Sequence, residues 1–260
     1  MPAIQLAHAG RKASTRRPWE GGGIVGPQEG GWQPVGPSAE AFHGLPTPTA
    51  LSVDEIKTIQ REFVDATRRA LAAGFKLVEF HGAHGYLAHS FYSPLSNHRT
   101  DQYGGSFANR IRFIADSVSL VREAWPANLP LWVRLSCGDW TDGGWTIDDS
   151  VELAKELKSR GADAIDCSSG GNVPGAKISL EPGYQVPFAE AIRNRAGIAT
   201  AVVGLISEPS HADEIVRSGR ADFVLVARQS LRDPYWPIRA AIALDQKDRA
   251  SIPPQYLRAF

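Results

Sequence analysis

A strand–helix–strand stretch decides the fold: residues 131–167 read LWVRLSCGDWTDGGWTIDDSVELAKELKSRGADAIDC. Each end of this stretch is a short apolar run, which is typical of a β-strand buried on both faces. Between them, Thr146 and Asp149 have the spacing of a capping box, with Asp in the position usually held by Glu or Gln. They predict a helix that continues to about Arg160 and ends at Gly161. A buried strand, a helix and a second buried strand together indicate a parallel sheet.

The same alternation extends in both directions from this stretch. We predict six strands, at residues 4–7, 76–80, 131–135, 164–167, 200–203 and 222–226. Helices are predicted between and after them, at residues 53–73, 107–125, 146–160, 187–195 and 207–218. A closed (β/α)₈ barrel needs eight strands. The pattern therefore predicts either an open parallel sheet or a barrel without its first two strand–helix units.

Composition excludes several classes of protein. Lys plus Arg and Asp plus Glu both number 28, so the net charge is zero and nothing indicates a nucleic-acid partner. No apolar run approaches the roughly 20 residues that a membrane span needs, and the N-terminus lacks the pattern of a secretory signal. Cys137 and Cys167 do not form a C-x-x-C motif and favour free buried thiols in a reducing compartment, the cytoplasm. Residues 13–50 are rich in Gly and Pro, and loops of that length are usually functional.

Two histidines follow the strand at residues 76–80. Active sites of barrels lie at the carboxyl ends of the strands, where His81 and His84 are expected. Their spacing leaves three interpretations open: a structural pair, two ligands of a metal site completed by Asp139 or Asp142, or two donors aimed at one developing oxyanion.

Two further features suit a bound anionic cofactor. Arg134 lies inside an apolar strand, where a guanidinium is costly unless it has a partner. Barrels often bind phosphate in the loops after the last two strands, and those loops begin at Gly204 and at Ala227–Arg228. Glycine allows close backbone approach and arginine is a bidentate phosphate ligand. No G-x-G-x-x-G fingerprint of a dinucleotide-binding domain is present in the sequence.

Several motifs resemble the Old Yellow Enzyme family of FMN-dependent ene-reductases. They are QLAHAGRK at residues 5–12, EFHGAHGY at 79–86, FYSPLSN at 91–97, RTDQYGGS at 99–106, Asn109–Arg110 and VAR at 226–228. The resemblance covers all 260 residues. The form with histidine at both 81 and 84 is similar to the bacterial class that includes thermophilic-type enzymes and xenobiotic reductases.

The resemblance implies a fold and an activity. The fold is a TIM (β/α)₈ barrel, here a single FMN-binding domain over residues 1–260 that begins at the third strand and lacks roughly a hundred residues of the family pattern at its front. The activity takes hydride from NADPH or NADH, bound transiently, and reduces activated C=C bonds of α,β-unsaturated carbonyls and nitroalkenes. The absent strands hold flavin contacts in the family, so we expect this chain alone to bind FMN weakly and to associate through its open edges. The alternatives are a metal-dependent barrel hydrolase that uses His81 and His84, and a non-catalytic barrel remnant.

The resemblance also implies roles for individual residues. His81 and His84 bind the substrate's carbonyl or nitro oxygen, and Tyr86 supplies the proton to the α-carbon. The flavin ring is contacted by Gln5, Lys12 and Arg134, and the FMN phosphate by Gly204, Ala227 and Arg228. Arg258 reaches the active site of a neighbouring subunit, which implies a homo-oligomer, a dimer or a tetramer.

Overall fold

Six parallel strands form the central sheet of the computed structural model, which describes residues 1–259. They are β1 (Ala3–Leu6), β4 (Leu77–Gly82), β5 (Leu131–Ser136), β6 (Ala164–Ser168), β7 (Ala199–Val202) and β8 (Phe223–Val224), paired in that order. All six predicted strands are confirmed, and the last is shorter than expected. The register places His81 beside Arg134 and Arg134 beside Asp166, so these side chains share one face of the sheet.

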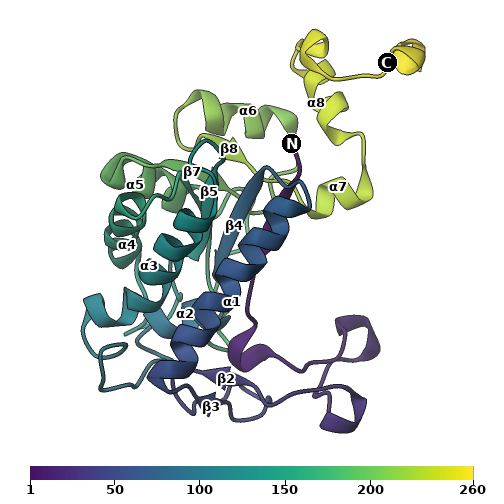
Figure 1. Ribbon diagram of the computed structural model, residues 1–260. Coiled ribbons are helices and arrows are strands. Elements are labelled where there is room, and N and C mark those ends of the chain that lie inside the picture. The colour runs from purple at the N-terminus through teal and green to yellow at the C-terminus, as the bar shows by residue number, and fades with distance from the viewer. Residues whose placement is uncertain (260) are drawn as a thin grey trace.

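Helices cover the other face of the sheet (Figure 1). They are α1 (Val53–Ala72), α3 (Phe107–Ala124), α4 (Ile147–Ser159), α5 (Val186–Ala196) and α6 (Pro209–Arg217). Both predicted capping boxes are present, because Ser52 pairs with Glu55 before α1 and Thr146 pairs with Asp149 before α4. A short buried helix, α2 (Leu87–Tyr92), begins directly after Tyr86 and was not predicted from the sequence.

The core lies between the sheet and these helices. Residues of β4 and β5 that point toward the helices, such as Val78, Phe80 and Val133, are fully buried. The rings of Phe63 in α1 and Phe80 in β4 lie 4.5 Å apart between centroids. This packing holds the carboxyl ends of the central strands in fixed positions.

The two outermost strands of the sheet are more exposed. Gln5 in β1 is exposed, and Phe223 in β8 keeps 45% of its surface accessible although its ring contacts Trp132. The sheet thus ends in β1 on one side and β8 on the other.

Two segments extend from the body (Figure 1). Residues 13–50 form the predicted excursion, at the lower right, with three-residue 3₁₀ turns and a small sheet of β2 (Val35–Gly36) and β3 (Thr49–Ala50). The chain ends in an arm at the upper right that holds α7 (Arg228–Arg232) and α8 (Trp236–Ala243). No helix within residues 1–259 is long and apolar enough to cross a membrane.

Candidate active site

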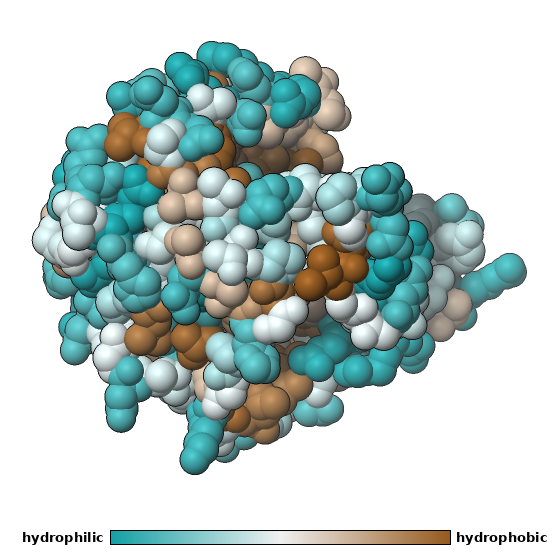
Figure 2. Space-filling model, turned by 90° about the horizontal axis from the view of Figure 1, so that it is seen from below, coloured by the Kyte–Doolittle hydropathy of each residue, from teal (hydrophilic) through white to brown (hydrophobic). Residues whose placement is uncertain are grey.

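A cavity of about 480 Å³ lies where the strands end, on the side of the molecule that carries the 13–50 excursion. Viewed from that side, apolar residues reach the surface in separate patches among hydrophilic ones (Figure 2). The cavity brings together six residues that the sequence analysis singled out: Gln5, Lys12, His81, His84, Tyr86 and Arg134. Thr15, Phe42 and Leu45 of the excursion complete its wall. The long loop therefore contributes to the site, as its length suggested.

Three ring side chains after β4 form a compact group. The centroid of the His81 ring lies 5.3 Å from that of His84 and 5.1 Å from that of Tyr86. His84 has a positive φ of 59°, and its backbone N–H donates to Ser136 Oγ at 2.9 Å while its Nε2 lies 2.7 Å from Ser168 Oγ. Two serines at the ends of β5 and β6 thus fix the tight turn that carries the histidines.

Both imidazoles are neutral near pH 7. Burial, and then the positive charge of Arg134, lowers the pKa of His81 to about 4 and that of His84 to about 3. The Nδ1 atom of His81 is buried and has no hydrogen-bond partner within the described chain. A buried polar atom without a partner is costly, so this nitrogen is suited to bind a polar atom of a ligand.

Lys12 lies against the cavity wall rather than in solvent. Its ammonium donates to the backbone carbonyls of His84, at 2.9 Å, and Gly171, and it lies 4.0 Å from the centroid of the Phe42 ring. Burial, and then the charge of Arg11, lowers its pKa to about 8. Lys12 thus joins the histidine turn to the loop after β6 and brings positive charge to the cavity.

A second cavity, of about 430 Å³, begins at Arg134 and extends past the ends of β7 and β8. Its lining includes the three residues predicted to hold phosphate, Gly204, Ala227 and Arg228. Gly204 has a φ of 142°, and a Cβ there would lie 3.0 Å from the Tyr184 ring, so only glycine fits without strain.

Three guanidinium groups line this second cavity, those of Arg134, Arg228 and Arg232. Such a set suits a phosphate group. Because Arg134 lines both cavities, an elongated ligand with a polar ring system at one end and a phosphate at the other fits the pair. FMN has that chemistry.

The metal interpretation of the histidines has no support. Asp139 is buried and accepts hydrogen bonds from Ser93 and the backbone of Trp145, and its Oδ1 lies 2.9 Å from Nε2 of His89. Asp142 is exposed in a loop. Among residues 1–259, no three His, Cys, Asp or Glu side chains gather as metal ligands would. The expected alternative of a metal-dependent hydrolase therefore loses its structural basis.

One predicted site residue lies apart, and some site residues were missed. Arg258 is exposed in a 3₁₀ helix (Pro254–Ala259) of the C-terminal arm and lines neither cavity. The sequence analysis missed Ser136, Ser168 and Arg232. The two serines were detectable as polar residues at the carboxyl ends of apolar strands, whereas Arg232 is brought in only by the turn of α7.

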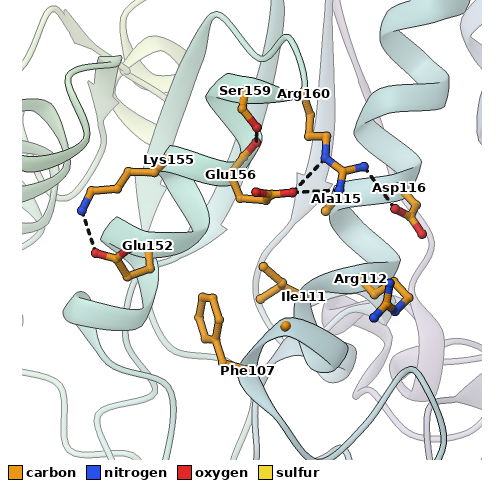
Figure 3. Close-up of a pocket in the computed structure, with 11 residues that line it drawn as sticks. Phe107, Ile111, Arg112, Ala115, Asp116, Glu152, Lys155, Glu156, Ser159 and Arg160 are labelled. Atoms are coloured by element: carbon orange, nitrogen blue, oxygen red, sulfur yellow. Dashed lines mark hydrogen bonds and ion pairs between the residues drawn. The ribbon is translucent and has the colours of Figure 1, made fainter.

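A third cavity, of about 460 Å³, lies between α3 and α4 (Figure 3). Its charged residues are largely paired with one another: Arg160 binds Asp116 and Glu156, and Lys155 binds Glu152. This groove belongs to the helical layer and contains none of the residues singled out above.

The chain matches known sequences along nearly its whole length. Residues 2–247 match the model of the NADH:flavin oxidoreductase / NADH oxidase family. The chain is 46% identical over 258 residues to NADPH dehydrogenase of Bacillus subtilis (strain 168), which covers 99% of this chain and 70% of that protein. It is 48% identical over 260 residues to NADPH dehydrogenase of Bacillus pumilus (strain SAFR-032), with coverage of 99% and 71%.

Solved structures share the fold. Morphinone reductase superposes with a TM-score of 0.74 at 28% identity, over 93% of this chain and 65% of that one. A complex of 2-naphthoyl-CoA reductase with 2-naphthoyl-CoA gives a TM-score of 0.79 at 26% identity, over 95% of this chain and 38% of that one. With the parallel sheet, these matches confirm the expected TIM-barrel fold in an incomplete form, six strands of eight.

Proposed function

The chain belongs to the NADH:flavin oxidoreductase / NADH oxidase family, and we propose that its two cavities around Arg134 are the two halves of one FMN site. The family and its relatives make this chain an FMN-dependent NAD(P)H oxidoreductase that acts on C=C bonds. The observation that carries the residue assignment is that Arg134 lines both cavities, with the histidines and Tyr86 on one side and Gly204 and Arg228 on the other.

The residues of the site divide into holders of the cofactor and binders of the substrate. Gln5, Lys12 and Arg134 would hold the ring system of FMN, and Gly204, the backbone of Ala227 and Arg228 would hold its phosphate, with Arg232 as an added ligand. Bound FMN supplies a hydride acceptor for the nicotinamide and a hydride donor for the β-carbon of the alkene. Arg134 places a positive charge where the reduced ring becomes anionic.

His81, His84 and Tyr86 act on the substrate. The neutral imidazoles donate N–H groups to the carbonyl or nitro oxygen and stabilise the negative charge that develops there. Tyr86 gives its phenolic proton to the α-carbon, a step that requires a basic enolate because phenol is a weak acid at neutral pH. The aromatic contact with His81 orients the Tyr86 ring toward the same cavity.

Ligand titrations test the division into two halves. Arg228→Ala combined with Arg232→Ala should weaken FMN binding about 10- to 100-fold, as the loss of charge-assisted hydrogen bonds implies. His81→Ala combined with His84→Ala should leave FMN binding within a few fold and weaken binding of a substituted phenol, followed by its charge-transfer band with flavin. Arg217→Ala, on the exposed part of α6, is the matched control. An equal loss of FMN affinity in both double variants would contradict the assignment.

The same proposal extends to the whole chain, its assembly and its location. The 260 residues act as one FMN-binding domain, the active form is a homo-oligomer, and Arg258 on the projecting arm reaches the site of a neighbouring copy. The free buried thiols Cys137 and Cys167 support a cytoplasmic location. Sedimentation and phenol binding, measured for the wild type and for Arg258→Ala, test the role of the arm. If both proteins are oligomers with the same phenol affinity, Arg258 does not reach the neighbouring site.

A further inference from the structure

Two carboxyl groups interact with each other and with Arg134 on the side of the sheet away from the helices. Glu79 in β4 and Asp166 in β6 lie within hydrogen-bonding reach of each other. The register explains the contact: Glu79 aligns with Gln5, and Asp166 aligns with Arg134, so both point to the face that carries the site. Neither residue has a part in the proposed chemistry.

The donors available to these carboxyls are too few for two ionised groups. Glu79 Oε1 accepts from Gln5 Nε2 at 2.6 Å. Asp166, whose side chain is 1% exposed, has an ion pair with Arg134 at 3.2 Å between Oδ2 and Nε, but the geometry is not that of a hydrogen bond. Both oxygens of Asp166 are buried without a hydrogen-bond donor in the described chain. A buried carboxylate in that state is costly unless a proton lies between it and its neighbour.

We propose that Glu79 and Asp166 share one proton at neutral pH and act as positioning residues that balance the charge of Arg134. With one shared proton, the two acids carry one negative charge, which neutralises the single positive charge of the guanidinium. Burial raises the pKa of both carboxyls, and for Asp166 the sum of burial, the opposing charge of Arg134 and the negative charge of Glu79 is a pKa raised to about 7. Arg134 acts in the opposite direction on both.

The other groups that face this pair do not supply the missing charge. On the same face, β4 also carries His81, which is neutral, and β5 carries Trp132 beside Arg134. β7 and β8 contribute Ala201 and Phe223 there, and β1 contributes the uncharged Gln5. The thiol of Cys167, next to Asp166 in β6, has its pKa raised by burial and stays protonated.

The consequence concerns the flavin site and rests on the proposed function. With its charge partly offset by one carboxylate, Arg134 stays in place at the junction of the two cavities, and its stabilisation of the reduced, anionic ring is moderated. Replacing either acid by its amide leaves one carboxylate beside one guanidinium, so the net charge of the group is unchanged. Removing both leaves Arg134 unbalanced and should favour the reduced, anionic flavin roughly tenfold, from a Coulomb term at an effective dielectric constant of about 20.

Infrared spectroscopy of the FMN-free chain tests the shared proton directly. The wild type should show the C=O band of a neutral carboxylic acid at neutral pH, and the band should be lost in Asp166→Asn, in Glu79→Gln, and in the wild type at high pH. Asp116→Asn, which removes an arginine-paired carboxylate on the outer face of α3, is the control and should keep the band. Absence of the band in the wild type at neutral pH, or its persistence in both single variants, would overturn the proposal.

The flavin midpoint potential tests the charge balance. With saturating FMN, each single variant should keep the wild-type potential at pH 7, and Glu79→Gln combined with Asp166→Asn should raise it. A stepwise rise in each single variant would mean that both acids are ionised in the wild type, and the proposal would be wrong. If FMN does not bind even at saturating concentration, the proposed function fails for these residues, while the infrared measurement still decides the question of the proton.

Discussion

The centre and the margins of the sheet differ in how completely they are packed. β4, β5 and β6 are almost entirely buried, and β6 has no exposed residue in its five positions. At the margins, β1 alternates between exposed and half-buried residues, and β8 has only two residues, neither of them buried. The histidine turn and Tyr86 depend on the centre, whereas the proposed phosphate cavity and Gln5 depend on the margins. The difference teaches that in this chain the residues proposed to bind the substrate are positioned more firmly than those proposed to bind the cofactor phosphate.

The largest expected effect comes from covering the margins. Adding the roughly one hundred residues that the family resemblance implies before β1 should supply strands beside β1 and β8 and raise the free energy of unfolding by several kcal/mol, at about 25 cal/mol per Å² of apolar surface over several hundred Å². That is comparable with the roughly 5–15 kcal/mol of an ordinary domain. FMN binding should change from weak to tight.

Thermal melting and flavin fluorescence measure both quantities in the chimera and in the 260-residue chain. A cooperative melt with tight, stoichiometric FMN binding in the 260-residue chain by itself would remove the contrast between centre and margins.

A substitution at the centre should act on chemistry alone. Tyr86→Phe removes the proposed proton donor, so the rate of alkene reduction should fall about 10²- to 10⁴-fold while flavin reduction by NADPH keeps its rate. Rapid-mixing kinetics of the two half-reactions, made in the chimera so that flavin is bound, separate them. Equal slowing of both would mean that Tyr86 shapes the cavity instead, and a loss of FMN binding would show that centre and margin are not independent.

The buried histidines of the centre should make stability depend on pH. In the unfolded chain they take up protons near pH 6.5, whereas in the folded chain His81 does so only near 4 and His84 near 3. Stability from this source is therefore fully present above pH 6.5 and is lost as the pH falls toward 3. Each unit by which folding lowers a histidine pKa corresponds to about 1.4 kcal/mol, and solvent screening reduces this amount for the partly exposed His84. Urea unfolding of His81→Gln combined with His84→Gln should show a flatter pH profile than the wild type, and exposed His43→Gln should not.

The smallest effect compares two helix caps. Thr146→Ala should cost about 1 kcal/mol of global stability, because α4 packs on the buried centre. Ser52→Ala removes the same kind of cap from α1, whose first turn lies far from the Phe63–Phe80 contact with β4 along the helix, and should cost less in global unfolding because opening of that turn is local. Hydrogen exchange should show the Ser52→Ala effect within α1. Equal losses in global stability would indicate that the margin unfolds together with the centre.

Much of the fold and part of the site could be predicted from the sequence. The strands, the caps at Ser52 and Thr146, and the position of His81 at a strand end follow from local periodicity and spacing, which are written in consecutive residues. The contact of Ser168 with His84 and the entry of Arg232 into the second cavity could not be predicted in the same way, because each joins elements distant in sequence.

The sequence by itself determined the parallel strand–helix order, the two-histidine motif and its family, because these depend on residue types at fixed spacings. Only the tertiary structure decided that Arg134 lines both cavities, that Lys12 is buried against the His84 turn, and that Glu79 meets Asp166. Those contacts arise from strand register and from the curvature of the sheet, which bring together side chains more than 70 positions apart, such as Gln5 and Glu79. No local pattern records such a contact, and the physical cause is the burial of the sheet's apolar face against the helices, which fixes the register of the polar face.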